Sequence, residues 1–294
     1  MDTFTIKDLE TISGIKAHTI RIWEQRYSLI KPTRTGTNIR RYSSDELRHI
    51  LNISLLNKNG FKISHISRMT ETEMQEKILS LSDVNAQRDR LINELIANLS
   101  TLELDEFEKQ IDSYIHSRGI EKTINQLIFP FLEKIGILWL TNNINPAQEH
   151  LVTNIIRSKL INGIECSHSH YKLNKTFLLF LPESEYHELG LLFVYYLLKS
   201  RGAKVHYLGS NIPLKDAAFV IRSLKPDVIY MHLTSTSSKF NLDKYLQHLK
   251  LHSGKIPVII SGYITQHYKK PPPVGFQLKK SLSQVMEYIS SLST

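Results

Sequence analysis

Apolar residues recur at helical spacing through the first part of the chain, and short apolar runs typical of strands replace them after about residue 170. Near the N-terminus, the segment 5–12 has the helical pattern and Gly14 ends it. A second helical pattern runs over residues 16–27. Because the turn between them has only three or four residues and contains glycine, the pattern predicts a helix-turn-helix.

Basic residues and a glycine-centred turn follow in the segment 31–42, and this composition favours a two-stranded wing. Further helices are expected over 43–58 and 63–69. Together these elements predict a winged helix-turn-helix domain over residues 1–75.

The middle of the chain carries Leu and Ile at three- and four-residue spacing with few helix breakers. Helices of this length bury their apolar stripes against one another, which predicts a four-helix bundle over residues 76–170. The expected helices span 73–100, 102–119, 120–140 and 146–161.

The last part alternates apolar strand patterns with helical ones, which argues for a parallel sheet covered on both faces. Strands are expected over 176–181, 204–208, 227–233 and 257–261, and helices over 189–200, 214–224, 242–251 and 281–292. We therefore expect a multidomain protein whose third domain, 171–294, is a flavodoxin-like (Rossmann-type) α/β domain.

Composition narrows the function classes. With 41% hydrophobic and 22% charged residues, the 294-residue chain is not disordered in the main, and no apolar stretch is long enough to span a bilayer. We expect a cytoplasmic protein without a membrane partner. The single cysteine, Cys166, excludes internal disulfides and thiolate zinc fingers. The net charge of +9 divides into +6 for residues 1–70, −6 for 71–170 and +9 for 171–294, and it suggests a polyanionic partner.

One long ordered string distinguishes the basic head from a surface helix with solvated charges: Thr19-Ile-Arg21-x-Trp23-Glu24-x-Arg26-Tyr27-x-Leu29-x-x-Pro32-x-Arg34, then Arg40-Arg41-Tyr42. It closely resembles the winged helix-turn-helix of MerR-family regulators. The resemblance implies a dimer on an inverted-repeat site in double-stranded DNA, with a recognition helix in the major groove. Trp23 is expected in the core. The implied DNA contacts are Lys16, His18, Thr19, Arg21, Arg26, Arg34, Arg40, Arg41 and Tyr42.

In the acidic middle segment, Trp139 closes one predicted helix, while Glu149 and His150 lie one turn into the next. Taken alone, Trp139 suits a core and the other two suit a surface. Their spacing resembles the cap of the light-sensing, cobalamin-binding CarH/CarA regulators, which carry MerR-type heads. The resemblance implies that these three residues cover the upper face of the corrin.

The loop after the first strand of the α/β domain carries Glu185-x-His187-x-x-Gly190. Ligands of parallel sheets bind at the carboxyl ends of the strands, and Gly190 stands where a bulky ligand could approach the backbone. The pattern resembles the Asp/Glu-x-His-x-x-Gly signature of cobalamin-binding domains. It implies that His187 is the lower axial ligand of cobalt, while Glu185 accepts the other ring N–H.

The sequence departs from that family at three places. The family's Ser-x-Leu, which lines the nucleotide tail, falls on Thr234-Ser235-Thr236, and its Gly-Gly reads Ser261-Gly262, where an added side chain crowds the tail. Leu140 stands where light-dependent relatives have an upper-ligand histidine. A hydrocarbon cannot coordinate cobalt, so the bis-histidine photoproduct should not form through this residue.

The resemblances together predict a transcriptional regulator, a repressor of the CarH/CarA kind, that acts in the cytoplasm on the nucleoid. Cobalamin, as adenosylcobalamin, would set its assembly as a dimer or tetramer and thereby its DNA affinity, with light as the signal. Two alternatives stay open: the α/β domain serves only in assembly or partner-protein binding, or the chain is a corrinoid methyl carrier. Without a phosphate loop, metal-ligand cluster or nucleophile elbow in the sequence, we expect no enzyme.

Overall fold

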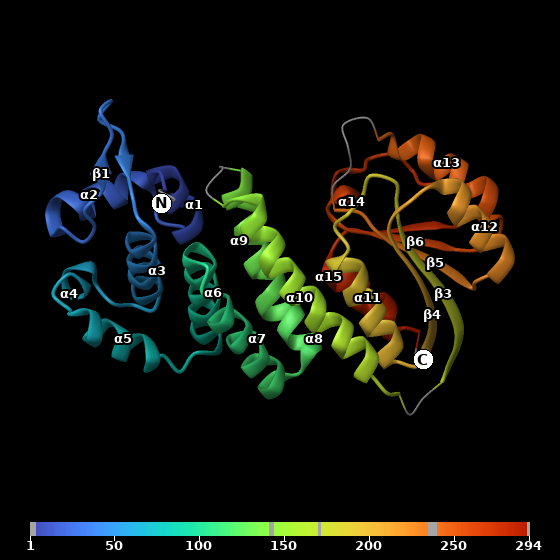
Figure 1. The fold of residues 1–294 in the computed structure, drawn as a ribbon, viewed down its shortest axis with the longest axis horizontal. Helices are drawn as coiled ribbons and strands as arrows, with labels where there is room; N and C mark the ends of the chain where they lie inside the picture. Colours follow the sequence, from blue (N-terminus) through green and yellow to red (C-terminus); the bar gives the residue numbers. More distant parts are fainter. Residues whose placement is uncertain (1–3, 141–143, 170–171, 235–239, 293–294) are drawn as a thin grey trace. The chain divides into compact units, whose positions relative to one another are not determined.

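The computed structural model describes residues 4–140, 144–169, 172–234 and 240–292. The chain divides into two compact units, residues 1–155 and 156–294 (Figure 1). Among the described residues, no helix has the length and apolar character that crossing a membrane requires.

The head of the first unit is the predicted winged helix-turn-helix. Thr5 begins the first helix with a capping box, in which its side chain and that of Asp8 each accept the other residue's backbone N–H. Gly14 ends this helix in the left-handed conformation at φ 73°. The elements are α1 (Ile6–Ser13), α2 (Ala17–Tyr27), the wing strands β1 (Thr33–Arg34) and β2 (Arg40–Arg41), α3 (Ser44–Lys58) and α4 (Ile63–Ile66).

The helix predicted over 73–100 is wrong, because two helices lie there. The first ends near residue 80, and Asp83 begins the second by accepting the backbone N–H groups of Asn85 and Ala86 at 2.9 and 3.0 Å. Five further helical segments follow. The middle elements are α5 (Glu71–Leu79), α6 (Val84–Thr101), α7 (Leu104–Arg118), α8 (Ile120–Thr123), the π-helical turn η1 (Ile124–Ile128), α9 (Phe129–Leu140) and α10 (Pro146–Cys166).

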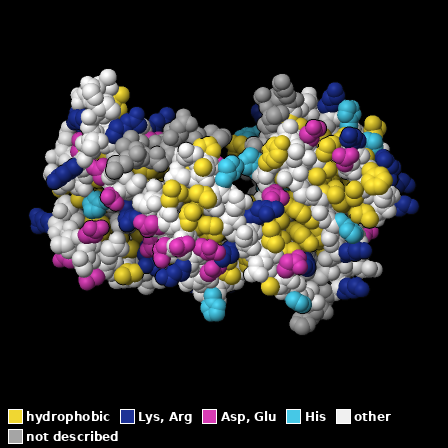
Figure 2. Space-filling model, in the orientation of Figure 1, with side chains coloured by type: hydrophobic (Ala, Val, Ile, Leu, Met, Phe, Trp, Pro, Cys, Tyr) yellow, Lys and Arg dark blue, Asp and Glu magenta, His cyan; other side chains and the backbone are white. Residues whose placement is uncertain are grey.

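The core of this helical segment contains Phe107 of α7 and Phe131 of α9, whose ring centroids lie 5.3 Å apart. Acidic side chains gather on the outside, over the middle helices (Figure 2). This distribution agrees with the net charge of −6 over residues 71–170.

The second unit contains a five-stranded parallel sheet in the order β4-β3-β5-β6-β7, which is the flavodoxin-like order. Helices cover both faces, with α11 and α15 on one side and α12 and α13 on the other (Figure 1). The elements are β3 (Leu173–Pro182), α11 (Leu189–Ser200), β4 (Ala203–Ile212), α12 (Leu214–Leu224), β5 (Val228–His232), α13 (Leu242–Ser253), β6 (Val258–Ser261), α14 (Tyr263–His267), β7 (Phe276–Lys279) and α15 (Leu282–Ser290).

Chain order reverses at the centre of this sheet, because β3 has β4 on one side and β5 on the other. In open parallel sheets, the crevice outside the carboxyl ends of the strands at such a switch point is the usual ligand site. The loop after β3, which carries His187, and the end of β5 at His232 flank this point.

Candidate functional site

Helix α2 has one buried face and one exposed face. Ile20 and Trp23 are buried at 0% and 7% exposure, which confirms Trp23 as a core residue. His18, Arg21 and Arg26 are exposed on the other side of the helix. The face that the sequence assigns to DNA is therefore accessible within its own unit.

The remaining predicted contacts on this helix lie at its start. Thr19 is partly buried, and Lys16 precedes the first turn with its ammonium 3.1 Å from the Glu10 carboxylate. The lysine side chain is nevertheless 83% exposed, so it remains available to a phosphate.

Glu24 joins α2 to the wing, a role that the sequence did not indicate. Its Oε2 accepts the Nε–H of Arg40 at 2.9 Å, and an Nη of Arg34 lies 4.0 Å from its Oε1. The hydrogen bond to Glu24 raises the pKa of the Arg40 guanidinium. Arg34 is exposed and Arg41 is partly buried, so the wing presents positive charge beside the recognition helix.

Tyr42 requires a correction, because its side chain is fully buried and cannot contact DNA in this structure. Its backbone pairs with Phe4, with Phe4 N–H to Tyr42 O at 2.8 Å and the reverse bond at 2.9 Å. Burial, followed by the Glu24 charge, raises the pKa of the phenol to about 12. Tyr42 therefore closes the head's core.

The predicted cap residues are only partly described. Asn145 caps α10, since its Oδ1 accepts the Ala147 backbone N–H at 2.9 Å. In the first turn of this helix, Glu149 is partly buried and His150 is exposed. The side chains of Trp139 and Leu140 lie outside the described part of the chain, so the convergence of the cap residues stays a prediction.

The loop after β3 holds His187 on a buried carboxylate. Glu185 has 0% exposure, and its Oε1 lies 2.7 Å from His187 Nδ1 and accepts the His187 backbone N–H at 2.9 Å. Its Oε2 accepts the Thr234 backbone N–H at 2.9 Å. A carboxylate only accepts, so the ring proton sits on Nδ1 and the Nε2 atom carries the lone pair.

The His187 side chain is 53% exposed, so this lone pair can reach a ligand. A neutral imidazole whose second nitrogen is bonded to a carboxylate is a common arrangement for a metal ligand. The donor set of this loop therefore fits axial coordination of a cobalt ion.

The residue after His187 is bonded on two sides. Glu188 Oε1 accepts the Nε–H of Arg157 from α10 at 2.5 Å, and its Oε2 accepts the Tyr207 hydroxyl at 2.7 Å. Burial, with the bond to Glu188, raises the pKa of Tyr207. The loop is therefore attached both to the sheet and to a long helix.

The space beside Gly190 is filled, contrary to the expectation that a ligand approaches the backbone there. A Cβ at this position would lie 2.3 Å from Nε2 of His232, the last residue of β5. The local structure also requires a glycine at position 262. The φ angle of Gly262 is +100°, and a Cβ there would lie 2.2 Å from the Leu233 carbonyl oxygen. The second predicted hydroxyl residue, Thr236, lies outside the described residues.

The side chain of Ser261, which we expected to crowd the nucleotide tail, forms hydrogen bonds within the domain. Its Oγ lies 2.9 Å from His232 Nδ1 and accepts the Tyr230 hydroxyl at 2.8 Å. His232 is not among the residues predicted from the sequence; the available signal was a polar residue at the end of an otherwise apolar strand.

Protonation of His232 is expected to destabilise the fold at acid pH. Burial lowers its pKa from about 6.5 to about 4, so between these values the unfolded chain binds a proton that the folded chain does not. Falling pH should therefore remove about 2 kcal/mol of unfolding free energy between pH 7 and 4.5. Urea unfolding of the unchanged chain and of His232→Asn measures this difference. Equal pH dependence in both chains would contradict the prediction.

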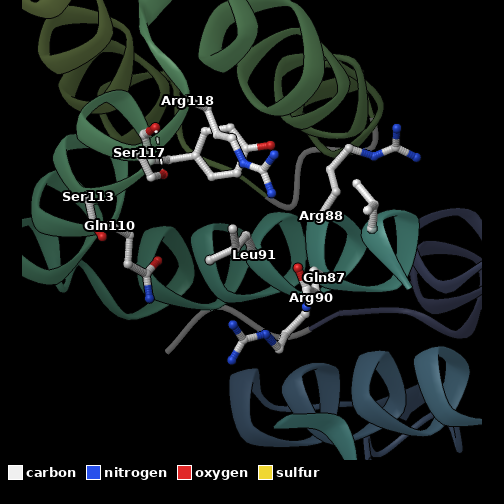
Figure 3. Close-up of a pocket in the computed structure, with 10 residues that line it drawn as sticks. Gln87, Arg88, Arg90, Leu91, Gln110, Ser113, Ser117 and Arg118 are labelled. Carbon is white, nitrogen blue, oxygen red and sulfur yellow. Dashed lines mark hydrogen bonds between the residues drawn. The ribbon is translucent and has the colours of Figure 1, made fainter. Parts of the chain in front are cut away.

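The helical segment also has a surface cavity of about 280 Å³, which α6 and α7 line with Arg88, Arg90 and Arg118. Figure 3 shows these three side chains extending in different directions. Arg88 and Arg90 also lie 3.6 Å from Asp89 and Glu94, respectively. Because the guanidinium groups do not converge, we assign no ligand to this cavity.

Comparison with known families agrees with the resemblances of the head and of the helical middle segment. Residues 4–73 match the model for the MerR HTH family regulatory protein, and residues 91–161 match that for the B12 binding domain. The structure of the Methanosarcina barkeri monomethylamine corrinoid protein shares the fold at a TM-score of 0.50, with 11% identity, over 69% of this chain and 95% of its own.

Two curated proteins of Myxococcus xanthus match along most of the chain. The HTH-type transcriptional repressor CarH is 24% identical over 272 residues, covering 88% of this chain and 89% of its own length. The HTH-type transcriptional repressor CarA is 24% identical over 287 residues, covering 97% and 95%. The chain thus joins a MerR-type helix-turn-helix to a B12-binding-domain region and is homologous to the CarH and CarA repressors over most of its length.

Proposed function

We propose that this chain is a DNA-binding transcriptional repressor whose assembly and DNA affinity depend on a bound cobalamin. The observation that carries the proposal is the exposed His187 imidazole, held by buried Glu185 at the switch point of the sheet. It occurs in a chain whose head exposes the basic side of α2. Both curated relatives are repressors, which supports regulation rather than enzymatic activity.

The DNA ligand is an inverted-repeat operator, bound by the heads of a dimer or a tetramer. Linking several heads raises their effective concentration at neighbouring half-sites, so a change of assembly changes DNA affinity without altering any single contact. Such a regulator acts in the cytoplasm, on the nucleoid.

Replacing Arg40 with alanine is expected to weaken DNA binding about 10-fold at all sequences and to reduce the salt slope by about one unit. Arg40 lies on the wing, where the resemblance to MerR-type heads implies contact with backbone phosphates or in the flanking minor groove. Band-shift titrations at several salt concentrations measure both quantities. Arg222→Ala, which removes an equal charge from an exposed site on α12, is the control. An unchanged salt slope for Arg40→Ala would count against the assignment.

The cobalamin would be held from below by the Nε2 atom of His187. Bound adenosylcobalamin supplies a light-sensitive cobalt–carbon bond, and we propose photolysis of that bond as the signal. Glu185 keeps the His187 ring in the tautomer that places its lone pair on Nε2. Leu140 has no donor atom, so its side chain would not coordinate the cobalt.

The direct test is to mix the purified chain with adenosylcobalamin in the dark, desalt it and record the visible spectrum. Retained colour with an imidazole-ligated spectrum is the expected result, and loss of all colour would refute the ligand. Size-exclusion runs in the dark and after illumination then test the signal. Identical elution in both would refute light-dependent assembly.

A second candidate function is supported by the place of His232. Because its ring fills the space beside Gly190, the α/β domain could serve in assembly or partner-protein binding without any corrinoid. The desalting experiment separates the two functions, since only the first requires retained cobalamin.

A further inference from the structure

Three polar side chains form a chain of hydrogen bonds at the carboxyl edge of the sheet. Tyr230 and Ser261 are buried at 0% and 1% exposure, and His232 follows them at the end of β5. The Tyr230 hydroxyl lies 2.8 Å from Ser261 Oγ, which lies 2.9 Å from His232 Nδ1. This chain of hydrogen bonds from Tyr230 through Ser261 fixes the orientation of the His232 imidazole.

These bonds occupy one side of the His232 ring: Ser261 Oγ accepts the Tyr230 hydroxyl and lies at hydrogen-bond distance from Nδ1. The opposite edge of the ring carries Nε2. This edge of the ring faces Gly190, where a Cβ would lie 2.3 Å from Nε2 and 2.4 Å from Cδ2.

The filled space lies close to the proposed cobalt ligand. Gly190 is in the first turn of α11, three residues after His187, and Glu185 bonds both His187 and the Thr234 backbone just beyond β5. A corrinoid that accepts His187 as its lower ligand must release its own nucleotide base on that same side. The displaced nucleotide would then need room at the edge that His232 occupies.

We propose that His232 is a specificity-determining residue that discriminates against the lower-face nucleotide of a corrinoid. Its imidazole, held by Ser261 and packed on Gly190, must turn away before the nucleotide can enter between the loop and the sheet. Cobalamin therefore binds more weakly than the same corrinoid without the nucleotide. This inference rests on the proposed function, because it takes His187 as the cobalt ligand.

The test compares aquocobalamin with diaquocobinamide, which lacks the nucleotide, by visible titration of the full chain. Because cobalamin must also release its own base, the decisive quantity is the change caused by His232→Ala. We expect this variant to bind cobalamin about 10-fold more tightly than the unchanged chain does, and to bind cobinamide with an affinity within about 2-fold of that of the unchanged chain. The 10-fold gain corresponds to about 1.4 kcal/mol of binding free energy, which belongs to the nucleotide alone. His248→Ala, an exposed histidine on α13, is the matched control and should alter neither affinity.

Two results would overturn the inference: an unchanged cobalamin affinity in His232→Ala, or an equal gain for both corrinoids. If neither corrinoid binds to the unchanged chain or to the variant, the proposed function is refuted. This inference would then fall with it.

A second measurement tests the packing without any corrinoid. Alanine at position 190 places a Cβ against the His232 ring, so Gly190→Ala should lower the midpoint of thermal unfolding by about 5 °C. In the His232→Ala background the same change should cost less than about 1 °C, because the space is open and alanine favours a helix. Equal losses in both backgrounds would show that the ring does not fill this space.

Discussion

Replacing His187 with alanine is expected to weaken cobalamin binding about 100-fold and to abolish the imidazole-ligated visible spectrum. The substitution removes the nitrogen donor whose position Glu185 fixes through Nδ1 at 2.7 Å. Loss of residues that only orient a metal ligand typically costs 10- to 100-fold in affinity, so loss of the ligand itself belongs at the upper end. The visible spectrum and the dissociation constant of the purified chain measure the two effects.

Two further variants sharpen this experiment. Glu185→Gln keeps the shape of the buried side chain but offers only one acceptor oxygen for its three donors, so an intermediate loss is expected. His206→Ala, which replaces a partly buried histidine on β4, should bind as the unchanged chain does. If the cobalt spectrum of His187→Ala equals that of the unchanged chain, His187 is not the ligand.

Replacing Arg21 with alanine is expected to lower operator affinity by about 10- to 100-fold, which corresponds to about 1–3 kcal/mol. Arg21 is exposed on the side of α2 opposite Ile20 and Trp23, where a recognition helix meets base edges. An arginine that reads a base also relaxes the sequence preference at that base when it is removed. Competition band shifts with single-base operator variants measure both the affinity and this loss of discrimination.

Arg118→Ala provides the control, because it removes an exposed arginine of equal charge from the end of α7. Its operator affinity and its base preference should both match the unchanged chain. If Arg21→Ala loses the same factor of affinity at all operator variants, Arg21 contacts phosphates and not bases.

The sequence predicted the head well because its signals are local. Gly14 ends α1 and Trp23 anchors α2, and both are explained by contacts within a few residues along the helix pair. Tyr42 was assigned wrongly because its burial depends on a backbone pairing with Phe4, 38 residues earlier, which no local pattern reveals. The bond of Glu24 to Arg40 likewise joins residues that are 16 positions apart in the sequence.

Helix limits and short strands were less predictable. Apolar spacing continues across residues 80–83, so only the capping role of Asp83 separates α5 from α6. Strand β7 was not predicted because its four residues, Phe276–Lys279, alternate over too short a range and follow a proline run. The position of β7 at the edge of the sheet is set by its parallel pairing with β6.

At the candidate ligand site, too, contacts between sequence neighbours could be predicted and contacts between distant residues could not. Glu185 and His187 are two residues apart, and their contact could be expected from the loop alone. The neighbour of Gly190 is His232, which lies on another strand, so a glycine that suggested room for a ligand in the sequence has a protein side chain beside it. Predicting this requires the strand order, which brings β3 and β5 together.

The bond between Arg157 and Glu188 gives the loop of His187 a mechanical attachment to α10. A shift of this loop must either break that bond or turn the helix with it. Arg157 is 9 residues from the end of α10 at Cys166, a distance of about 13 Å along the axis, so a tilt of about 10° displaces that end by about 2 Å. A rigid helix pivoting on one ion pair would thus convert a small shift of the His187 loop into a motion large enough to repack side chains.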